Sequence, residues 1–261
     1  LGTPLSKAIL KETYSQFVNR YDKNHGGFGT QPKFPSPHNL VYLLRYHHMT
    51  DDKTALEMVE KTLQEMRLGG IFDHVGYGFH RYATDKEWLV PHFEKMLYDQ
   101  AMLVMAYTEA FQITGKPEYK KTAEEILTYV QRDMTDAKGG FYSAEDADSE
   151  GEEGLFYIWT IQELQSIIGE EDTQFIQNIF NLTPEGNFKD EASGQFTGKN
   201  IFHLKTPISN SKDLKKISQI REKIFHVREK RIHPLKDDKI LTDWNGLMIA
   251  AMAKAGVAFQ D

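Results

Sequence analysis

Apolar residues recur at helical spacing through the first part of the chain. Residues 4 to 20 carry one such stripe, which ends before the turn-rich residues 22 to 27. Pro37 can open a second helix that runs toward Met49, because proline is tolerated in a first turn. Asp51 or Asp52 can cap a third helix, which ends before Gly69 and Gly70. The pattern therefore predicts three helices before residue 70.

A similar pattern returns further on. We expect one helix from about Pro91 to Thr114, another from 117 to about 134, and two more over 211 to 231 and from Thr242 to Phe259. Residues 141 to 210 differ, with an acidic loop, the short apolar run 155 to 159, two short helical patterns and a stretch rich in Gly, Asn and Thr over 184 to 200. These residues predict an irregular excursion near 141–210 that contains short strands.

Two internal repeats indicate repeated helical hairpins. A double glycine followed by an aromatic residue occurs at 26–28, 69–72 and 139–141, and Lys95 to Asp99 resembles Lys239 to Asp243. Hairpins of this kind need neighbours that cover their apolar faces, which favours an all-α fold, either an α/α toroid or, as the alternative, an open solenoid. Six hairpins need about twelve principal helices, whereas the pattern contains about seven long ones. We therefore interpret residues 1–261 as one toroid domain truncated at its C-terminus, whose last helix leaves an apolar patch that drives association.

Composition narrows the functional classes. The net charge of −7 gives no general attraction to nucleic acid or anionic lipid. No apolar run approaches a membrane span and the N-terminus lacks a signal peptide, so we interpret the chain as soluble and cytoplasmic. The absence of cysteine excludes disulfides and thiol catalysis within this chain. The residues from Asp146 to Tyr157 approximate a calcium loop, but Tyr157 stands where a glutamate is needed, so we expect no metal site and no cofactor.

Four stretches resemble one protein family. Residues 69–102 carry the longest match, and residues 27–35, 143–151 with 156–159, and 238–246 fit the same family. They resemble the spermatogenesis-associated, thioredoxin-domain-containing proteins and their bacterial relatives. The resemblance implies a toroid of the six-hairpin glycosidase type, distantly similar to N-acylglucosamine 2-epimerases and unsaturated glucuronyl hydrolases. It also implies a thioredoxin-like domain ahead of the toroid in the full-length protein, and this chain contains no such domain.

A predicted helix face carries the first candidate chemistry. Spacing of three and then four residues would place His92, Lys95 and Asp99 on one face near the helix N-terminus. A lysine in the first turn of a helix interacts unfavourably with the helix dipole, and Lys239 with Asp243 repeats this unfavourable arrangement. We read these residues as the wall of a polar cavity shared with Trp244, or alternatively as structural ion pairs between hairpins.

The loop 73–90 contains a second set of candidate catalytic and substrate-binding residues. His74 or His92 could remove a proton next to a carbonyl group, as a 2-epimerase requires, although each histidine can equally be structural. Arg81 and Tyr82 could position the substrate, while Trp88 or Trp244 could stack on a sugar face. The motif at 238–246 adds Lys239 and Asn245 as candidate substrate contacts.

Glycoside hydrolysis would instead need two carboxylates across the scissile bond. The candidates are Asp99, Asp146, Asp148 and Asp243, and the acidic loop around 146–148 could equally be solvated. Two functions therefore stay open. The chain is an enzyme that isomerises or hydrolyses a mono- or oligosaccharide, or it is a non-catalytic toroid that binds a carbohydrate or a protein.

Overall fold

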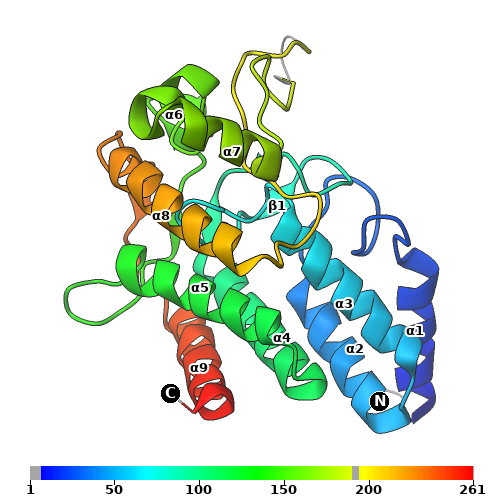
Figure 1. Ribbon diagram of the computed structural model, residues 1–261. Helices are drawn as coiled ribbons and strands as arrows, with labels where there is room; N and C mark the ends of the chain where they lie inside the picture. The colour runs from blue at the N-terminus through cyan, green and yellow to red at the C-terminus, as the bar shows by residue number, and fades with distance from the viewer. Residues whose placement is uncertain (1–6, 190–193, 261) are drawn as a thin grey trace.

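The computed structural model describes residues 7–189 and 194–260, and within these ranges the chain is mainly helical. Residues 4–6 of the helix predicted over 4–20 lie outside the described ranges, and the described part of this helix begins at Lys7. The helices, shown in Figure 1, are α1 (Lys7–Arg20), α2 (Pro37–Thr50), α3 (Lys53–Leu68), α4 (Leu97–Thr114), α5 (Pro117–Asp133), α6 (Ile161–Ile168), α7 (Glu170–Phe180), α8 (Ser211–Arg228) and α9 (Thr242–Phe259).

Short turns join the helices into hairpins. The side chain of Asp52 accepts a hydrogen bond from the backbone N–H of Ala55 and so caps α3, as predicted. Gly115 ends α4 with a φ of 69°, a left-handed conformation that glycine adopts without steric cost. Both α2 and α5 have proline in the first turn, where no backbone donor is lost. Local sequence therefore sets the two hairpins α2–α3 and α4–α5.

Helices α2, α4 and α9 form the inner layer of the fold. Helix α4 packs against α2 on one side and α9 on the other, and α5 covers it from outside. The three helices run the same way, with their C-terminal ends together at the bottom of Figure 1. Glu109 of α4 binds Arg45 of α2 at 2.9 Å and Lys254 of α9 at 2.5 Å. This buried carboxylate therefore ties the three inner helices together.

The start of α4 differs from the prediction. The predicted helix begins at about Pro91, but α4 begins at Leu97, and His92 and Lys95 lie in extended segments. Strand β2 (Pro91–His92) pairs with β1 (Tyr82–Ala83), and β3 (Lys95–Met96) pairs with β4 (Ala144–Glu145). These distant partners satisfy the backbone groups that a helix would have satisfied locally. His92, Lys95 and Asp99 therefore do not share a helix face.

Short strands connect the helices to the excursion, as predicted. Strand β4 also pairs with β7 (Lys236–Asp237), which makes the three-stranded order β3–β4–β7. Strands β5 (Asp148–Ser149) and β6 (Glu152–Glu153) form an antiparallel hairpin. The apolar run 155–159 is mostly a turn, and only Trp159 makes a bridge, with Asn200.

The double glycines serve close packing as well as turns. A Cβ atom at Gly69 would lie 2.3 Å from the carbonyl oxygen of Trp88, and one at Gly70 would lie 2.2 Å from that of Leu89. Both distances are too short for a side chain. The second glycine pair of the repeat thus lets the end of α3 pass directly beside the loop that leads to α4.

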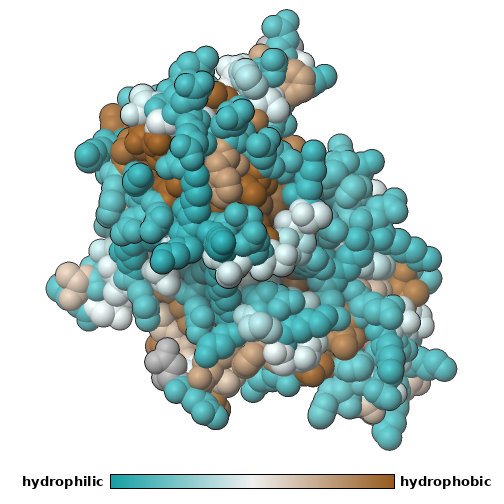
Figure 2. Space-filling model, in the orientation of Figure 1, coloured by the Kyte–Doolittle hydropathy of each residue, from teal (hydrophilic) through white to brown (hydrophobic). Residues whose placement is uncertain are grey.

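The excursion shares a separate apolar core with α8. Helices α6 and α7 of the excursion and α8 enclose buried side chains that include Leu164, Ile176 and Ile224. Figure 2 shows apolar side chains between these helices on a face that is otherwise mostly polar. Within the described residues, no helix is long and apolar enough to cross a membrane. The predicted class is confirmed: an all-α fold of the α/α toroid kind with a few short strands.

Candidate functional site

Aromatic side chains gather where the inner helices begin. Phe34 precedes α2, Tyr98 lies in the first turn of α4, and Trp244 lies in the first turn of α9. The rings of Tyr98 and Trp244 meet edge to face with centroids 4.8 Å apart, and those of Phe34 and Tyr82 are also 4.8 Å apart. The N-terminal ends of parallel helices carry partial positive charge, so this end of the inner layer suits polar or anionic ligands.

Arg81 organises the polar groups at this end. Its backbone N–H donates to the carbonyl oxygen of Glu94, and its Nη1 donates to Oε2 of the same residue, both at 2.8 Å. The Tyr98 hydroxyl is a further partner of its guanidinium. Its Nε is buried and has no hydrogen-bond partner. A buried donor without a partner is costly, and a ligand oxygen would satisfy it.

Asp99 is a buried acid beside Arg81. Its side chain is 7% exposed, and its Oδ2 has no hydrogen-bond partner. Burial raises the pKa of Asp99 to about 7; the charge of Arg81 opposes this shift, and that of Glu94 adds to it. The position of Asp99 in the first turn of α4 would favour the charged form, so burial outweighs the helix dipole here. A carboxyl group with this pKa can donate or accept a proton near neutral pH.

His92 forms a second acid–base pair with Glu153 of β6. Its Nδ1 lies 2.7 Å from Oε1 of Glu153, and its Nε2 lies 3.7 Å from Oε2 of Glu94. Its ring stacks on that of Tyr82 with centroids 4.9 Å apart. The side chain of His92 is one-quarter exposed. A carboxylate on one ring nitrogen orients the other nitrogen for proton transfer.

Lys95 belongs to a different, buried set of charges. Its Nζ lies 2.8 Å from Oδ2 of Asp73, whose Oδ1 lies 2.9 Å from Nη1 of Arg228. The side chain of Lys95 is 1% exposed, and burial lowers its pKa. The prediction that Lys95 faces a substrate cavity with His92 is therefore wrong, because Lys95 is enclosed by its buried partners Asp73 and Tyr77, whereas His92 is partly exposed. The structural ion pair is the reading that its contacts support.

His74 and Trp88 are internal residues. Arg67 and the carbonyl oxygen of Gly69 contact the two ring nitrogens of His74, and burial lowers the pKa of His74 to about 3. Trp88 is 0% exposed and donates its indole N–H to the carbonyl oxygen of His25. The prediction that Trp88 stacks on a sugar is wrong, because no face of its ring is accessible.

The remaining predicted residues are mostly exposed or bound to groups outside the Arg81 cluster. Asp146 and Asp148 are exposed on the acidic loop, as in its solvated reading, and Asp243 is exposed at the start of α9. Lys239 pairs with Asp237 at 2.6 Å. Asn245 exchanges two hydrogen bonds with the backbone of Phe141 and so fastens α9 to the loop after α5. Lys239 and Asp243 are therefore not equivalent in environment to Lys95 and Asp99.

The structure brings Arg81, Tyr82, His92, Asp99 and Trp244 to one end of the inner layer. It adds four residues that the sequence analysis did not select: Phe34, Glu94, Tyr98 and Glu153. Glu94 and Tyr98 lie inside the longest family-like stretch, close in sequence to His92 and Asp99, and this position could have identified them as site residues. Among the described residues, no group of three or more His, Asp or Glu side chains is arranged to hold a metal ion.

No family model matches the chain. Human spermatogenesis-associated protein 20 is 39% identical over 97% of this chain, and the mouse protein is 38% identical over 98%. The resemblance to this family is confirmed. The chain spans 36% of the length of each of these two relatives.

Among solved structures, similar chains include three proteins that act on carbohydrates. They are cellobiose 2-epimerase from Bacillus thermoamylovorans (12% identical, TM-score 0.47, 95% of this chain and 72% of that one), D-mannose isomerase (12%, 0.46, 100% and 84%) and an unsaturated glucuronyl hydrolase specific for heparin (11%, 0.48, 98% and 69%).

Proposed function

We propose that this chain carries the acid–base site of a carbohydrate-active enzyme that isomerises a sugar by proton transfer. Asp99 carries the proposal: a buried carboxyl group with one unpartnered oxygen and a pKa of about 7 beside Arg81. Near pH 7 the protonated and ionised forms of such a group are comparably populated, so it can both donate a proton and take one back.

The proposed reaction uses two residues as proton carriers. Nε2 of His92 removes a proton from the carbon next to the sugar carbonyl, while Asp99 donates its proton to the carbonyl oxygen. The product of this step is an enediol. In the second step Asp99 takes the proton of the neighbouring hydroxyl, and His92 returns its proton to carbon. Glu153 stabilises the imidazolium between the steps, and Arg81 holds the substrate oxygens.

The aromatic surroundings support a sugar as substrate. Rings from Tyr82 and Trp244 border the polar groups, and such rings stack on the apolar faces of sugars. Localised polar groups beside aromatic walls are typical of small-molecule sites.

Glycoside hydrolysis is the second candidate, favoured by Asp99 and Glu94. Glu94 is paired with the Arg81 guanidinium, whereas Asp99 is buried and holds its proton. Two carboxyl groups in such opposed environments match the acid and base roles of a glycosidase.

One experiment separates these functions. The protein is incubated in D₂O with aldoses, N-acylated amino sugars and uronides, and in parallel with 4-nitrophenyl glycosides. Deuterium entering the sugar carbon skeleton, lost in His92→Ala and Asp99→Asn, supports the isomerase. Release of 4-nitrophenol that needs Asp99 and Glu94 but not His92 supports the hydrolase. Sugar binding without either signal would favour a non-catalytic carbohydrate-binding toroid.

A further inference from the structure

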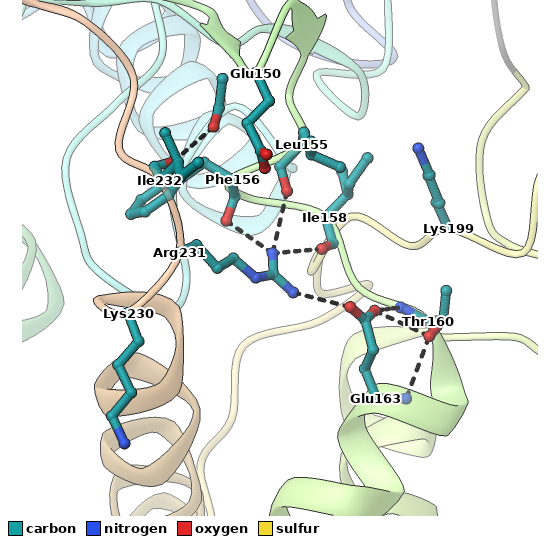
Figure 3. A pocket seen from close by; sticks show the side chains of 11 residues that line it. Glu150, Leu155, Phe156, Ile158, Thr160, Glu163, Lys199, Lys230, Arg231 and Ile232 are labelled. Atoms are coloured by element: carbon teal, nitrogen blue, oxygen red, sulfur yellow. Dashed lines mark hydrogen bonds and ion pairs between the residues drawn. The ribbon is translucent and has the colours of Figure 1, made fainter.

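A cavity opens beside the β5–β6 hairpin, whose residue Glu153 contacts His92. Its volume is about 440 Å³, and it opens between this hairpin, the start of α6 and the residues that follow α8. Figure 3 shows its lining side chains, with the Arg231 guanidinium at the centre. None of the groups in the proposed proton transfer lines it.

The wall around Arg231 is built from fixed groups. Nη1 of Arg231 donates to the carbonyl oxygens of Leu155, Phe156 and Ile158 at 2.9–3.1 Å, and the guanidinium lies 3.6 Å above the ring of Trp159. Its Nη2 reaches Glu163, which also closes the capping box of α6 with Thr160. These contacts hold the cavity open before any ligand arrives, which lowers the entropic cost of binding.

The charges around this cavity are mixed and nearly balanced. Lys199, Lys230 and Arg231 stand against Glu150 and Glu163, a difference of one charge. Within the described part of the chain, the side chains of Glu150 and Lys230 form no ion pair or hydrogen bond, and the Lys230 ammonium extends away from Arg231 (Figure 3). Carboxylates only accept hydrogen bonds and ammonium groups only donate them, whereas a sugar hydroxyl does both. The apolar side chains of Ile158 and Ile232 add a surface for C–H groups.

We propose that this cavity binds a neutral sugar unit, and that it is a second subsite for an oligosaccharide whose reacting unit lies at His92 and Asp99. The second half of this inference rests on the proposed function. Balanced donors and acceptors fit a neutral polyhydroxylated ligand better than an anion or a cation, because neither charge sign prevails.

The β5–β6 hairpin connects the two places. Glu153 contacts His92, and the adjacent Glu152 forms an ion pair with Lys199 of the cavity wall. Leu155, also in the wall, follows Glu153 by two residues, so their Cα atoms lie within about 7 Å. This closeness along the chain supports one oligosaccharide as the ligand of both places.

Binding is tested first, independently of turnover. Asp99→Asn protein is titrated with cellobiose, maltose and mannobiose, and with glucose and mannose, while ¹⁵N NMR follows the backbone signals of residues 149–163 and 230–232. We expect at least one disaccharide to shift these signals. Glu150→Ala, which removes an acceptor, and Ile232→Trp, which fills the cavity, should each weaken that binding by about tenfold.

Two matched variants control for surface changes. Glu222→Ala removes an exposed carboxylate of α8, and Ile240→Trp enlarges an exposed isoleucine, and both residues lie outside the cavity lining. Both should bind like the parent. If no sugar shifts the cavity signals, or if Glu150→Ala and Ile232→Trp bind as the controls do, the subsite is wrong.

Turnover then tests the oligosaccharide claim. Cavity variants should raise KM for a disaccharide about tenfold, and leave kcat and the KM for a monosaccharide unchanged. Equal KM changes for both substrates would overturn the subsite. Cavity binding in a protein that converts no sugar would retain the sugar site and refute only the proposed enzyme.

Discussion

Asp73 and Arg228 are 155 positions apart in the sequence, yet Oδ1 of Asp73 lies 2.9 Å from Nη1 of Arg228. Both side chains are almost fully buried, and Lys95 shares the same carboxylate. The two cations hold the pKa of Asp73 well below its usual range despite its burial. Arg228 ends α8, so Asp73 fastens α8 to the loop after α3 and, through Lys95, to the strand that precedes Tyr98 and Asp99.

Removal of Arg228 should therefore destabilise the fold strongly. We expect Arg228→Met to lower the free energy of unfolding by about 3–5 kcal/mol, because it leaves part of a buried charge uncompensated. Urea denaturation measures the change. Arg45→Met is the control, since Arg45 is mostly exposed in its pair with Glu109, and it should cost about 1 kcal/mol or less. Equal losses in the two variants would contradict the role of burial.

The pKa of Asp99 predicts a pH dependence of stability. The folded chain binds a proton at Asp99 up to about pH 7, whereas the unfolded chain releases it near the ordinary value of 3.8. Between these values the folded state holds more protons, so the contribution of Asp99 to the free energy of unfolding falls as pH rises. The total is on the order of 4 kcal/mol.

Asp99→Asn removes this dependence. The stability of the variant relative to wild type should increase steadily from about pH 4 to pH 7 and level off above it. Chemical denaturation at several pH values measures the difference. A constant difference over this range would show that Asp99 titrates like an exposed carboxylate.

The pair of His92 and Glu153 makes a prediction for turnover of a monosaccharide. Glu153→Gln should lower kcat by about a hundredfold with little change in KM, because the imidazolium loses its carboxylate partner. Glu152→Gln changes the neighbouring residue of β6, which does not contact His92, and kcat should be retained. A similar loss in both variants would assign the effect to the hairpin rather than to His92.

Exposed apolar residues of α9 lead us to expect self-association. Ile249 and Val257 of α9 are 61% and 81% exposed. An apolar stripe of this kind promotes contact between molecules. Ile249→Lys combined with Val257→Glu should lower the average mass measured by light scattering at high concentration. Met49→Lys, at an apolar position of α2 that is 59% exposed, should not. A wild-type protein that is monomeric by light scattering at every concentration would refute the prediction.

Local sequence determined most of the helices. Asp52, Pro37, Gly115 and Pro117 act through hydrogen bonds and dihedral preferences within a few residues, so the hairpins α2–α3 and α4–α5 follow from the sequence alone. The residue at which α4 begins could not be predicted from the local sequence. Lys95 is held extended by Glu145, fifty positions away, and a local pattern carries no information about such a partner.

The candidate site divides in the same way. The sequence identified Arg81, His92 and Asp99 by residue type and by their place in a family-like stretch. Only the tertiary structure decided that Trp88 is enclosed, that Lys95 turns toward Asp73, and that Asp99 is buried next to Arg81. Burial and the distance between charges determine the protonation of a side chain, and both depend on residues brought together from distant parts of the chain.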